Sequence, residues 1–358
     1  MKSKEAEKQR NIRENNYDLL RIIATLAVIM IHVSATYKDA MGNPDILGAC
    51  YTEHVETIYL YNVFSRFAVP CFVMLSGAFV LVDERNREYN YFYRKVFRNI
   101  GIPTLIFSVG YFLLSLAIKV AAIVINGVAW TQLLEPVMML LRGEPYYHIW
   151  YLYMMVGVYL LAPVVIRFRE SIDPKAFSVV AWTFLVLAGI SAWTSERYLN
   201  WDLGYSFCYL GYFMVGYEIR KSWGQRKSNV LGTSMILLGF GVELLIALLQ
   251  IKYHGTTASI DMIKNLVDPQ CPLVVLASVL IFAGFSCLDL KRGFGSLSKM
   301  TFLMYLFHAG VWEVLKRLIV KVWGANGDCR IMIPVAIVVC FFISYFLGVL
   351  YSKLFSRP

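Results

Sequence analysis

The sequence predicts an all-α fold, that of a polytopic membrane protein built as a bundle of about ten transmembrane helices with both termini cytoplasmic. Composition is the first observation that supports this class: 58% of the 358 residues are hydrophobic, 16% are charged and the mean hydropathy is +0.57. Soluble domains are about 45–50% apolar and about 25% charged. Apolar windows of roughly 20 residues, enough to cross a bilayer as a helix, also recur along the chain. The basic residues gather in alternate connecting segments, as in cytoplasmic loops.

Ten apolar windows mark the expected helices. They cover residues 17–37, 57–82, 100–125, 148–166, 176–194, 203–219, 229–250, 271–287, 300–320 and 331–350. The window 203–219 is the weakest, because it is short and rich in Gly and Tyr. We expect one transmembrane domain over residues 17–352, with a basic tail at residues 1–16 and a second short tail at residues 353–358.

The net charge of +10 follows from the same topology. Lysines and arginines are frequent in the N-terminal tail and in every second connecting segment after it, while the segments between them hold few. This bias places the tail in the cytoplasm and makes the protein multi-pass. Insertion in a lipid bilayer therefore explains the basic charge, and we expect no nucleic-acid partner.

Several sequence motifs are missing, and their absence narrows the chemistry. There is no GxxxxGK[ST], GxSxG or HExxH motif, which leaves P-loop phosphoryl transfer, an α/β-hydrolase triad and zinc proteolysis unsupported. The seven cysteines form no CxxC pair and no metal-ligand spacing, so we expect no metal. Cys50 and Cys329 fall in connecting segments on the same predicted side, and the sequence leaves a disulfide between them open. The first apolar run lacks the cleavage site of a signal peptide.

The first apolar window, DLLRIIATLAVIMIH, carries polar side chains where the solvent is hydrocarbon. Arg21 and His32 are 11 residues apart, which puts them on one helical face about 16 Å apart along the axis. Asp18 and Thr25 fall on the same stripe. Polar groups facing lipid are costly, so this face is expected to line a protein interior or a wet cavity. The alternative is that Arg21 reaches the headgroups and His32 makes a structural hydrogen bond.

The second window places Arg66 near the middle of the membrane, with Asn62 one turn away. An arginine at this depth needs a partner or water, so it is either functional or part of a structural charge pair. Pro70 and the pair Ser76–Gly77 are the expected kink sites.

The window 300–320 carries Tyr305, His308 and Trp312 on one helical face. His308 lies about 12 Å above the cytoplasmic start of this window, and so approaches the middle of the membrane. A structural core histidine is the equal alternative.

A polar and aromatic group precedes the window 148–166 and faces the extracytoplasmic side. A ring-rich mouth of this kind suits a sugar or polyol, although an interfacial aromatic belt explains the same residues. The candidate acceptor-binding residues here are Glu144, Tyr147, His148 and Trp150.

These stretches together resemble the acyltransferase-3 family of bacterial integral-membrane acyltransferases. The family's Arg-x10-His pattern corresponds to Arg21 and His32. Three further stretches are similar: FSRFAVPCFVMLSG, HIWYLYMMVGVYLLAPVV and LSKMTFLMYLFHA, with YLGYFMVGYEI a weaker match. The resemblance spans nearly the whole chain, and it is the order and spacing of the motifs that make it specific.

The resemblance implies a ten-helix bundle in the bacterial plasma (inner) membrane, of the stand-alone type without a soluble esterase-like domain. It implies transfer of a non-aminoacyl group, usually acetyl or succinyl, from cytoplasmic acyl-CoA to a hydroxyl of a cell-envelope glycan or related acceptor, as in polysaccharide O-acetylation. Some relatives are membrane portions of amino-acid racemases linked to transport. A transporter of an amino acid or envelope intermediate is therefore the alternative function.

Under the enzymatic interpretation His32 is the general base, because an imidazole near its ordinary pKa accepts a proton at neutral pH. Arg21 binds a CoA phosphate, and Arg66 stabilises the oxyanion or holds the acceptor. These three are the expected catalytic residues. The further expected phosphate contacts are Arg94, Lys95 and Arg98. The expected supporting residues are Asp18, Thr25, Asn62, Tyr305 and His308. The acceptor, the acyl group and the oligomeric state are left open.

Overall fold

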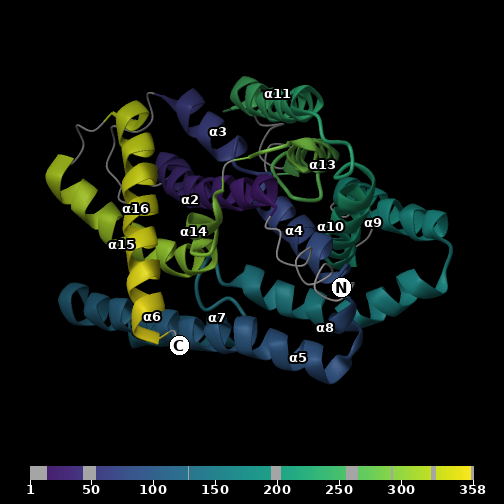
Figure 1. Cartoon of the computed structure of the whole chain (residues 1–358). Helices are drawn as coiled ribbons and strands as arrows, with labels where there is room; N and C mark the ends of the chain where they lie inside the picture. Colours follow the sequence, from purple (N-terminus) through teal and green to yellow (C-terminus); the bar gives the residue numbers. More distant parts are fainter. Residues whose placement is uncertain are drawn as a thin grey trace. The chain divides into compact units, whose positions relative to one another are not determined.

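A computed structural model describes residues 14–42, 54–127, 129–194, 203–254, 265–291, 293–323 and 328–355. Within these ranges the chain is helical and contains no β-strand, so the all-α fold class is confirmed (Figure 1). The helices are α2 (Asn15–Gly42), α3 (Val55–Val63), α4 (Ala68–Val80), α5 (Tyr89–Val96), α6 (Ile102–Asn126), α7 (Leu134–Leu141), α8 (Trp150–Ser171), α9 (Pro174–Thr194), α10 (Leu203–Ser222), α11 (Asn229–Tyr253), α13 (Pro272–Cys287), α14 (Gly295–Ser298), α15 (Thr301–Trp323) and α16 (Cys329–Phe355).

Seven stretches of helix within the described residues are long and apolar enough to cross a membrane. Each of the ten predicted windows falls on helix, but α10, α13 and α15 are not among the seven. Helix α13 has 16 residues and is the shorter kind of apolar helix, while α15 carries charged residues in its second half. The count of ten spans and the orientation of the termini stay predictions. The seven stretches are Asn15–Ala40, Val55–Val80, Tyr89–Ile125, Trp150–Ser171, Pro174–Ser191, Asn229–Tyr253 and Cys329–Leu354.

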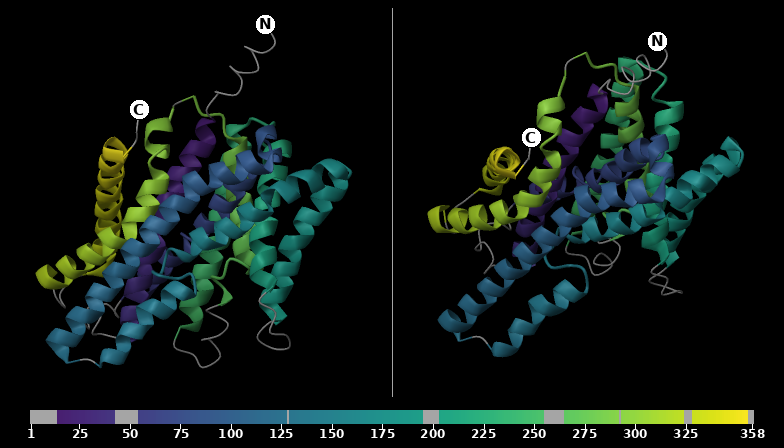
Figure 2. Two further views of the ribbon diagram at one scale, coloured as in Figure 1. Left: turned by 90° about the horizontal axis from the view of Figure 1, so that it is seen from below. Right: turned by 60° about the horizontal axis from the view of Figure 1, so that its bottom comes forward.

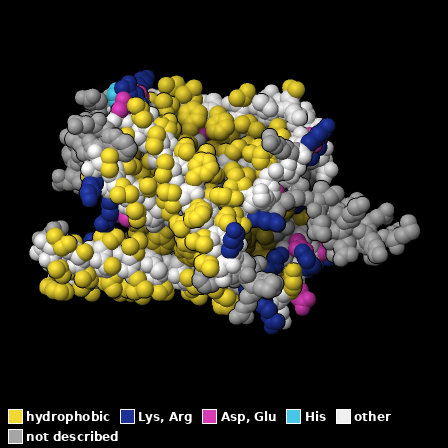
Figure 3. All heavy atoms as spheres, turned by 60° about the vertical axis from the view of Figure 1, so that its left-hand side comes forward, with side chains coloured by type: hydrophobic (Ala, Val, Ile, Leu, Met, Phe, Trp, Pro, Cys, Tyr) yellow, Lys and Arg dark blue, Asp and Glu magenta, His cyan; other side chains and the backbone are white. Residues whose placement is uncertain are grey.

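Apolar side chains cover much of the surface, as lipid-facing helices require. Figure 3 shows one face on which hydrophobic side chains predominate. On α16, large apolar side chains such as Phe342 and Phe346 are exposed. These exposed apolar side chains are what is expected of helices whose outer faces contact the lipid hydrocarbon.

The chain divides into two compact units. Unit 1 comprises Met1–Ala78 and Ser178–Pro358, and unit 2 comprises Phe79–Phe177. In unit 1, α2 packs against α3, α13, α14, α15 and α16, while α11 pairs with α13 (Figure 1). The helix with the polar stripe is therefore an interior element of its unit. The single domain expected over 17–352 stays a prediction.

Unit 2 is built around a long helical rod (Figure 2). Helix α5, a π-helical turn at Phe97–Gly101 and α6 run on from one another over Tyr89–Ile125, 37 residues in all. A helix of this length is about 55 Å long, well beyond the roughly 30 Å of a bilayer core. The basic residues of α5 therefore extend beyond the apolar part of the rod.

The predicted span 57–82 is two helices rather than one. Helix α3 ends at Val63, α4 begins at Ala68, and the residues between them form turns. Pro70 explains the break, because its ring clashes with the carbonyl group four residues earlier, at Arg66. Inside the first turn of α4 the missing N–H of Pro70 costs no helical hydrogen bond. The break thus leaves Arg66 on non-helical backbone, which at membrane depth requires burial in protein or a cavity.

The pair Ser76–Gly77 was expected to kink the helix, but α4 continues through both residues. Gly77 has a different role: a Cβ atom there would overlap the backbone carbonyl of Phe213 on α10. A Cβ on Gly216 of α10 would likewise overlap the carbonyl of Met74. Glycine at both positions lets the two helices approach closely, as is common in membrane bundles.

Candidate functional site

The N-terminal end of the polar stripe on α2 is an ion pair. Arg21 Nη1 lies 2.9 Å from Asp18 Oδ1. The Asp18 side chain is only 1% exposed, and it also accepts a hydrogen bond of 2.7 Å from Ser298 Oγ of α14. The Arg21 side chain stays 29% exposed. Asp18 therefore holds Nη1 of Arg21, while the exposed part of the Arg21 side chain remains accessible to an anion.

Hydroxyl groups along α2 connect this stripe to neighbouring backbone. Thr25 Oγ1 donates to the carbonyl of Arg21 at 2.8 Å, so its proton is used within the helix. One turn beyond the imidazole, Thr36 Oγ1 donates to the carbonyl of His32 at 3.0 Å and accepts from Trp312 Nε1 at 2.9 Å. This bond joins α2 to α15 and sets the register of the two helices beside His32.

Two histidines meet in the interior of unit 1. The ring centroids of His32 on α2 and His308 on α15 lie 5.2 Å apart, with the ring planes at 31°. His308 is fully buried, and its Nδ1 lies 2.5 Å from the carbonyl oxygen of Tyr305. A carbonyl oxygen can only accept, so Nδ1 of His308 carries the proton and Nε2 of the neutral ring is an acceptor. The sequence placed both rings deep in the membrane, and the structure brings them together.

Arg66 joins this pair from the break between α3 and α4. Its Nε donates to the backbone carbonyl of Asn62 at 3.2 Å, and Nη2 donates to the Asn62 side-chain oxygen. Asn62 Nδ2 in turn donates to Ser34 Oγ of α2 at 3.1 Å. Ser34 lies two residues after His32, so Asn62 links the Arg66 side chain to the part of α2 that carries the imidazole. Unit 1 therefore collects an imidazole pair and a guanidinium from three separate elements, α2, α15 and the α3–α4 break.

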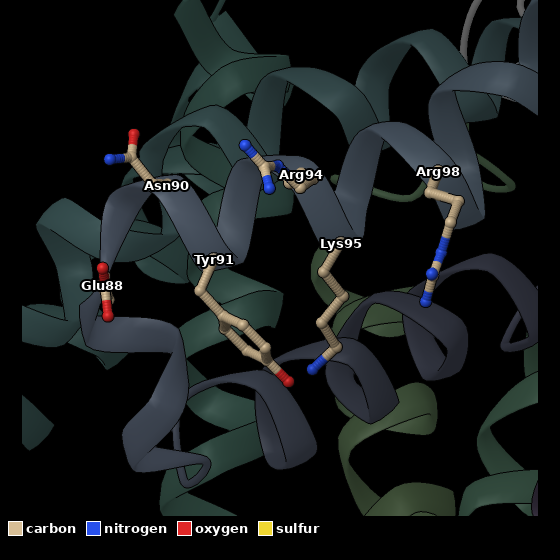
Figure 4. Close-up of a pocket in the computed structure, with 6 residues that line it drawn as sticks. All are labelled: Glu88, Asn90, Tyr91, Arg94, Lys95 and Arg98. Carbon is tan, nitrogen blue, oxygen red and sulfur yellow. The ribbon is translucent and has the colours of Figure 1, made fainter.

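A separate basic pocket lies in unit 2. It has a volume of about 540 Å³ and is lined by Glu88, Asn90, Tyr91, Arg94, Lys95 and Arg98 (Figure 4). These residues include all three of the further phosphate contacts predicted from the sequence. The spacing of Tyr91, Lys95 and Arg98 puts them on one face of the rod, and Figure 4 shows the three side chains extending from the same side.

The charges of this pocket are only partly balanced. Lys95 Nζ lies 3.5 Å from Asp83 Oδ2 and 3.3 Å from Asn86 Oδ1. A hydrogen bond from Arg85 lowers the pKa of Asp83 below its usual value, so this carboxylate is charged at neutral pH. Within the part of the chain that the structure describes, neither Arg94 nor Arg98 has an ion-pair partner. An anion can therefore bind here without first displacing a carboxylate from either arginine.

The predicted acceptor-binding residues all lie at the start of α8 or just before it, in unit 2. His148 is 1% exposed and packs edge-on against Tyr111, with ring centroids 4.7 Å apart. Glu144 and Tyr147 are exposed, and Trp150 is half-buried. The structure thus places His148 inside an aromatic cluster and leaves Glu144 and Tyr147 as the accessible members. Acceptor binding by these residues stays a prediction.

One charged side chain of unit 1 escaped the sequence analysis. Glu243 lies in the apolar run of α11 and is 0% exposed. Its Oε1 accepts the backbone N–H of Phe67 at 3.1 Å, next to Arg66. The signal was a lone acidic residue in the middle of a 25-residue apolar helix, which by itself marks a candidate functional position.

The pairing of Cys50 with Cys329, which the sequence left open, falls partly outside the described residues, because Cys50 is not among them. Cys329 is buried, with its Sγ 3.9 Å from the carbonyl oxygen of His54. No group of His, Cys, Asp and Glu within the described ranges could hold a metal ion.

The fold and the site define a multi-pass membrane protein with a buried polar centre made of imidazole and guanidinium groups. The comparison with protein families assigns the class: the model described as an acyltransferase domain matches residues 14–353. The chain belongs to this acyltransferase-3 family and is a membrane acyltransferase. Comparisons with curated proteins and with solved structures found no match.

Proposed function

We propose that the protein transfers an acyl group, acetyl by the family resemblance, from cytoplasmic acyl-CoA to a hydroxyl of a cell-envelope glycan or related acceptor. The observation that carries this proposal is the 5.2 Å contact of the His32 and His308 rings, with Arg66 linked through Asn62 to Ser34, two residues after His32 on α2. A base and a cationic oxygen-binding group are the two things that acyl transfer from a thioester to an alcohol needs. We assign the protein to the bacterial plasma membrane.

The proposed step begins when His32 removes the proton of the acceptor hydroxyl as its oxygen attacks the thioester carbonyl carbon. The carbonyl electron pair moves onto oxygen, and Arg66 stabilises that oxyanion. Collapse of the intermediate re-forms the carbonyl and breaks the carbon–sulfur bond. The leaving CoA thiolate takes the proton from His32, which returns to its neutral form. His308, held by the Tyr305 carbonyl at 2.5 Å, supports the His32 ring from the opposite helix.

Donor binding is assigned to the cationic groups. CoA carries a pyrophosphate and a ribose phosphate, and arginine binds phosphate through paired N–H donors. The pocket of about 540 Å³ with Arg94, Lys95 and Arg98 lies within the usual range for small-molecule sites. The partly exposed guanidinium of Arg21 is a further candidate for a phosphate. Glu144, Tyr147, His148 and Trp150 are proposed for the acceptor, with the two exposed side chains in direct contact.

The test is release of free CoA by the purified protein in detergent. Acetyl-CoA is supplied alone and with isolated cell-envelope glycan, and the free thiol is measured with a chromogenic reagent. His32→Ala and His32→Gln are expected to lower turnover by about 10²–10⁴-fold, because both remove the base. The matched control is His254→Ala, because the ring nitrogen Nδ1 of His254 bonds the Tyr59 hydroxyl at 3.0 Å and the residue has no part in the proposed transfer. The control should stay within about twofold of the parent. Near-normal turnover in both His32 variants would refute the assignment.

A transporter of an amino acid or an envelope intermediate is the second candidate, and the broken span α3–α4 favours it. Membrane transporters place the ends of discontinuous helices at their substrate sites, and Arg66 lies at such a break. Uptake of a labelled amino acid into proteoliposomes without acyl-CoA tests this candidate. Uptake that Arg66→Gln abolishes would support transport, whereas no uptake alongside His32-dependent CoA release would support the enzyme.

A further inference from the structure

Glu243 is a fully buried carboxylate in contact with the segment that carries Arg66, and only one of its oxygens has a hydrogen-bond partner among the described residues. Oε1 accepts the N–H of Phe67 at 3.1 Å. Oε2 is buried and has no hydrogen-bond partner among the described residues. The residue is 0% exposed and is the single acidic residue of a largely apolar helix. Burying a carboxylate in such a place is costly unless a nearby positive charge compensates.

The hydrogen bond between Glu243 and Phe67 lies at the N-terminal end of helix α4. Phe67 directly precedes α4, where the first backbone N–H groups have no acceptor inside the helix. A carboxylate at this end satisfies one of them and also interacts favourably with the helix dipole. Arg66 is the neighbouring residue in the chain. Glu243 therefore holds, from a separate helix, the same short segment that presents the guanidinium.

Glu243 also contributes to the charge balance of Arg66. Within the described residues, the hydrogen bonds of the guanidinium go to Asn62, a neutral residue. Glu243 accepts the N–H of Phe67, the residue that follows Arg66, so this contact holds a carboxylate beside the segment that carries the guanidinium. Within the described residues no ion pair joins Arg66 to a carboxylate, so N–H groups of the guanidinium remain for a substrate oxygen.

We propose that Glu243 is a positioning residue for Arg66: it caps α4 and supplies a counter-charge that keeps the guanidinium directed at the reacting acyl oxygen. This inference rests on the proposed acyltransferase function. It assigns to α11 a part in catalysis that the motifs of α2, α4 and α15 do not indicate.

The kinetic test compares Glu243→Gln, which keeps an oxygen for the Phe67 N–H but removes the charge, with Glu243→Ala, which removes both. We expect kcat for acetyl-CoA cleavage to fall about tenfold and about 100-fold, respectively, with KM changed by less than about twofold. Glu218→Gln is the matched control, because Glu218 on α10 also has a buried oxygen without a hydrogen-bond partner in the described chain. A loss in Glu243→Gln no larger than in the control would overturn the proposal.

Coupling separates positioning from a purely structural role. In an Arg66→Lys background, whose ammonium cannot reproduce the guanidinium fork, Glu243→Gln should cost less than about twofold. The same tenfold loss in both backgrounds would mean that Glu243 acts independently of Arg66, and the proposal would be wrong.

A second measurement does not depend on turnover. The unfolding midpoint in detergent is compared for the parent, Glu243→Gln, Arg66→Gln and the double variant. Each single change leaves a buried charge less well compensated, so the double variant should be more stable than the sum of the single losses predicts. Strictly additive losses would overturn the inference. If the parent releases no CoA, the proposed function fails while this cycle still decides the role of Glu243.

Discussion

The contact between α11 and α13 offers a test of the packing that holds Glu243 in place. A Cβ added to Gly232 on α11 would lie 2.7 Å from the carbonyl oxygen of Gly284 and 2.8 Å from Cδ2 of Leu288. On Gly241 of the same helix, a Cβ would meet nothing within 4 Å. Gly232→Ala and Gly241→Ala therefore add the same methyl group to the same helix. They differ only in the space available for that methyl group.

The expected magnitude follows from these distances. Ordinary carbon–oxygen contact lies at or beyond about 3.4 Å, so alanine at residue 232 must push the two helices apart by roughly 0.7 Å. Overpacking of this kind costs about 1–3 kcal/mol. Replacing a helical glycine by alanine gains up to about 1 kcal/mol, and this gain is common to both variants. Gly232→Ala should therefore be about 1–3 kcal/mol less stable than Gly241→Ala.

Thermal unfolding in detergent, followed by tryptophan fluorescence, measures this difference. The apparent midpoint of Gly232→Ala should lie several degrees below that of Gly241→Ala, which should equal or exceed the parent. Equal midpoints for the two variants would show that α11 and α13 do not approach closely at Gly232 and Gly284.

Three further predictions concern single contacts. Asp18→Asn should lower the unfolding midpoint through a loss of about 1–3 kcal/mol, because it removes the charge that pairs with Arg21 at 2.9 Å; an unchanged midpoint would contradict this. Trp312→Phe should cost about 0.5–1.5 kcal/mol by removing the Nε1 bond to Thr36, and Trp312→Phe combined with Thr36→Val should cost less than the sum of the two single changes. Asp83 has a lowered pKa, so its stabilising effect is complete above the unfolded-state pKa of about 3.9 and is lost as pH falls through the lower folded-state value. Asp83→Asn should therefore be less stable than the parent at neutral pH and equal to it in strong acid; a difference that persists at low pH would refute the linkage.

The helical architecture could be predicted from the sequence, because a bilayer imposes a minimum length of apolar residues on every span. All ten windows fall on helix for this reason. The polar stripe could also be predicted, since spacing along one helix fixes which side chains share a face. The interruption at residues 64–67 could be predicted only in part. Pro70 predicts a disruption of the helix, but the helix breaks about four residues before the proline.

The contacts between helices could not be predicted in the same way. His32 and His308 are 276 residues apart, and only tertiary packing sets the 5.2 Å between their rings. Glu243 could not be predicted from a polar stripe, because it is the single acidic residue of its helix. The division into two units also depends on the packing between helices, which the sequence of a single apolar stretch does not show.

The central claim is that the acyl group reacts between His32 and Arg66. An experimental structure of the protein with a non-transferable acyl-CoA analogue tests it most directly. We expect the carbonyl carbon that stands in for the thioester carbon to lie within about 4 Å of the His32 ring. We expect the oxygen of that carbonyl to lie within about 3 Å of an Arg66 N–H. An analogue bound with its acyl end away from both side chains, or with His32 turned toward lipid, would contradict the account.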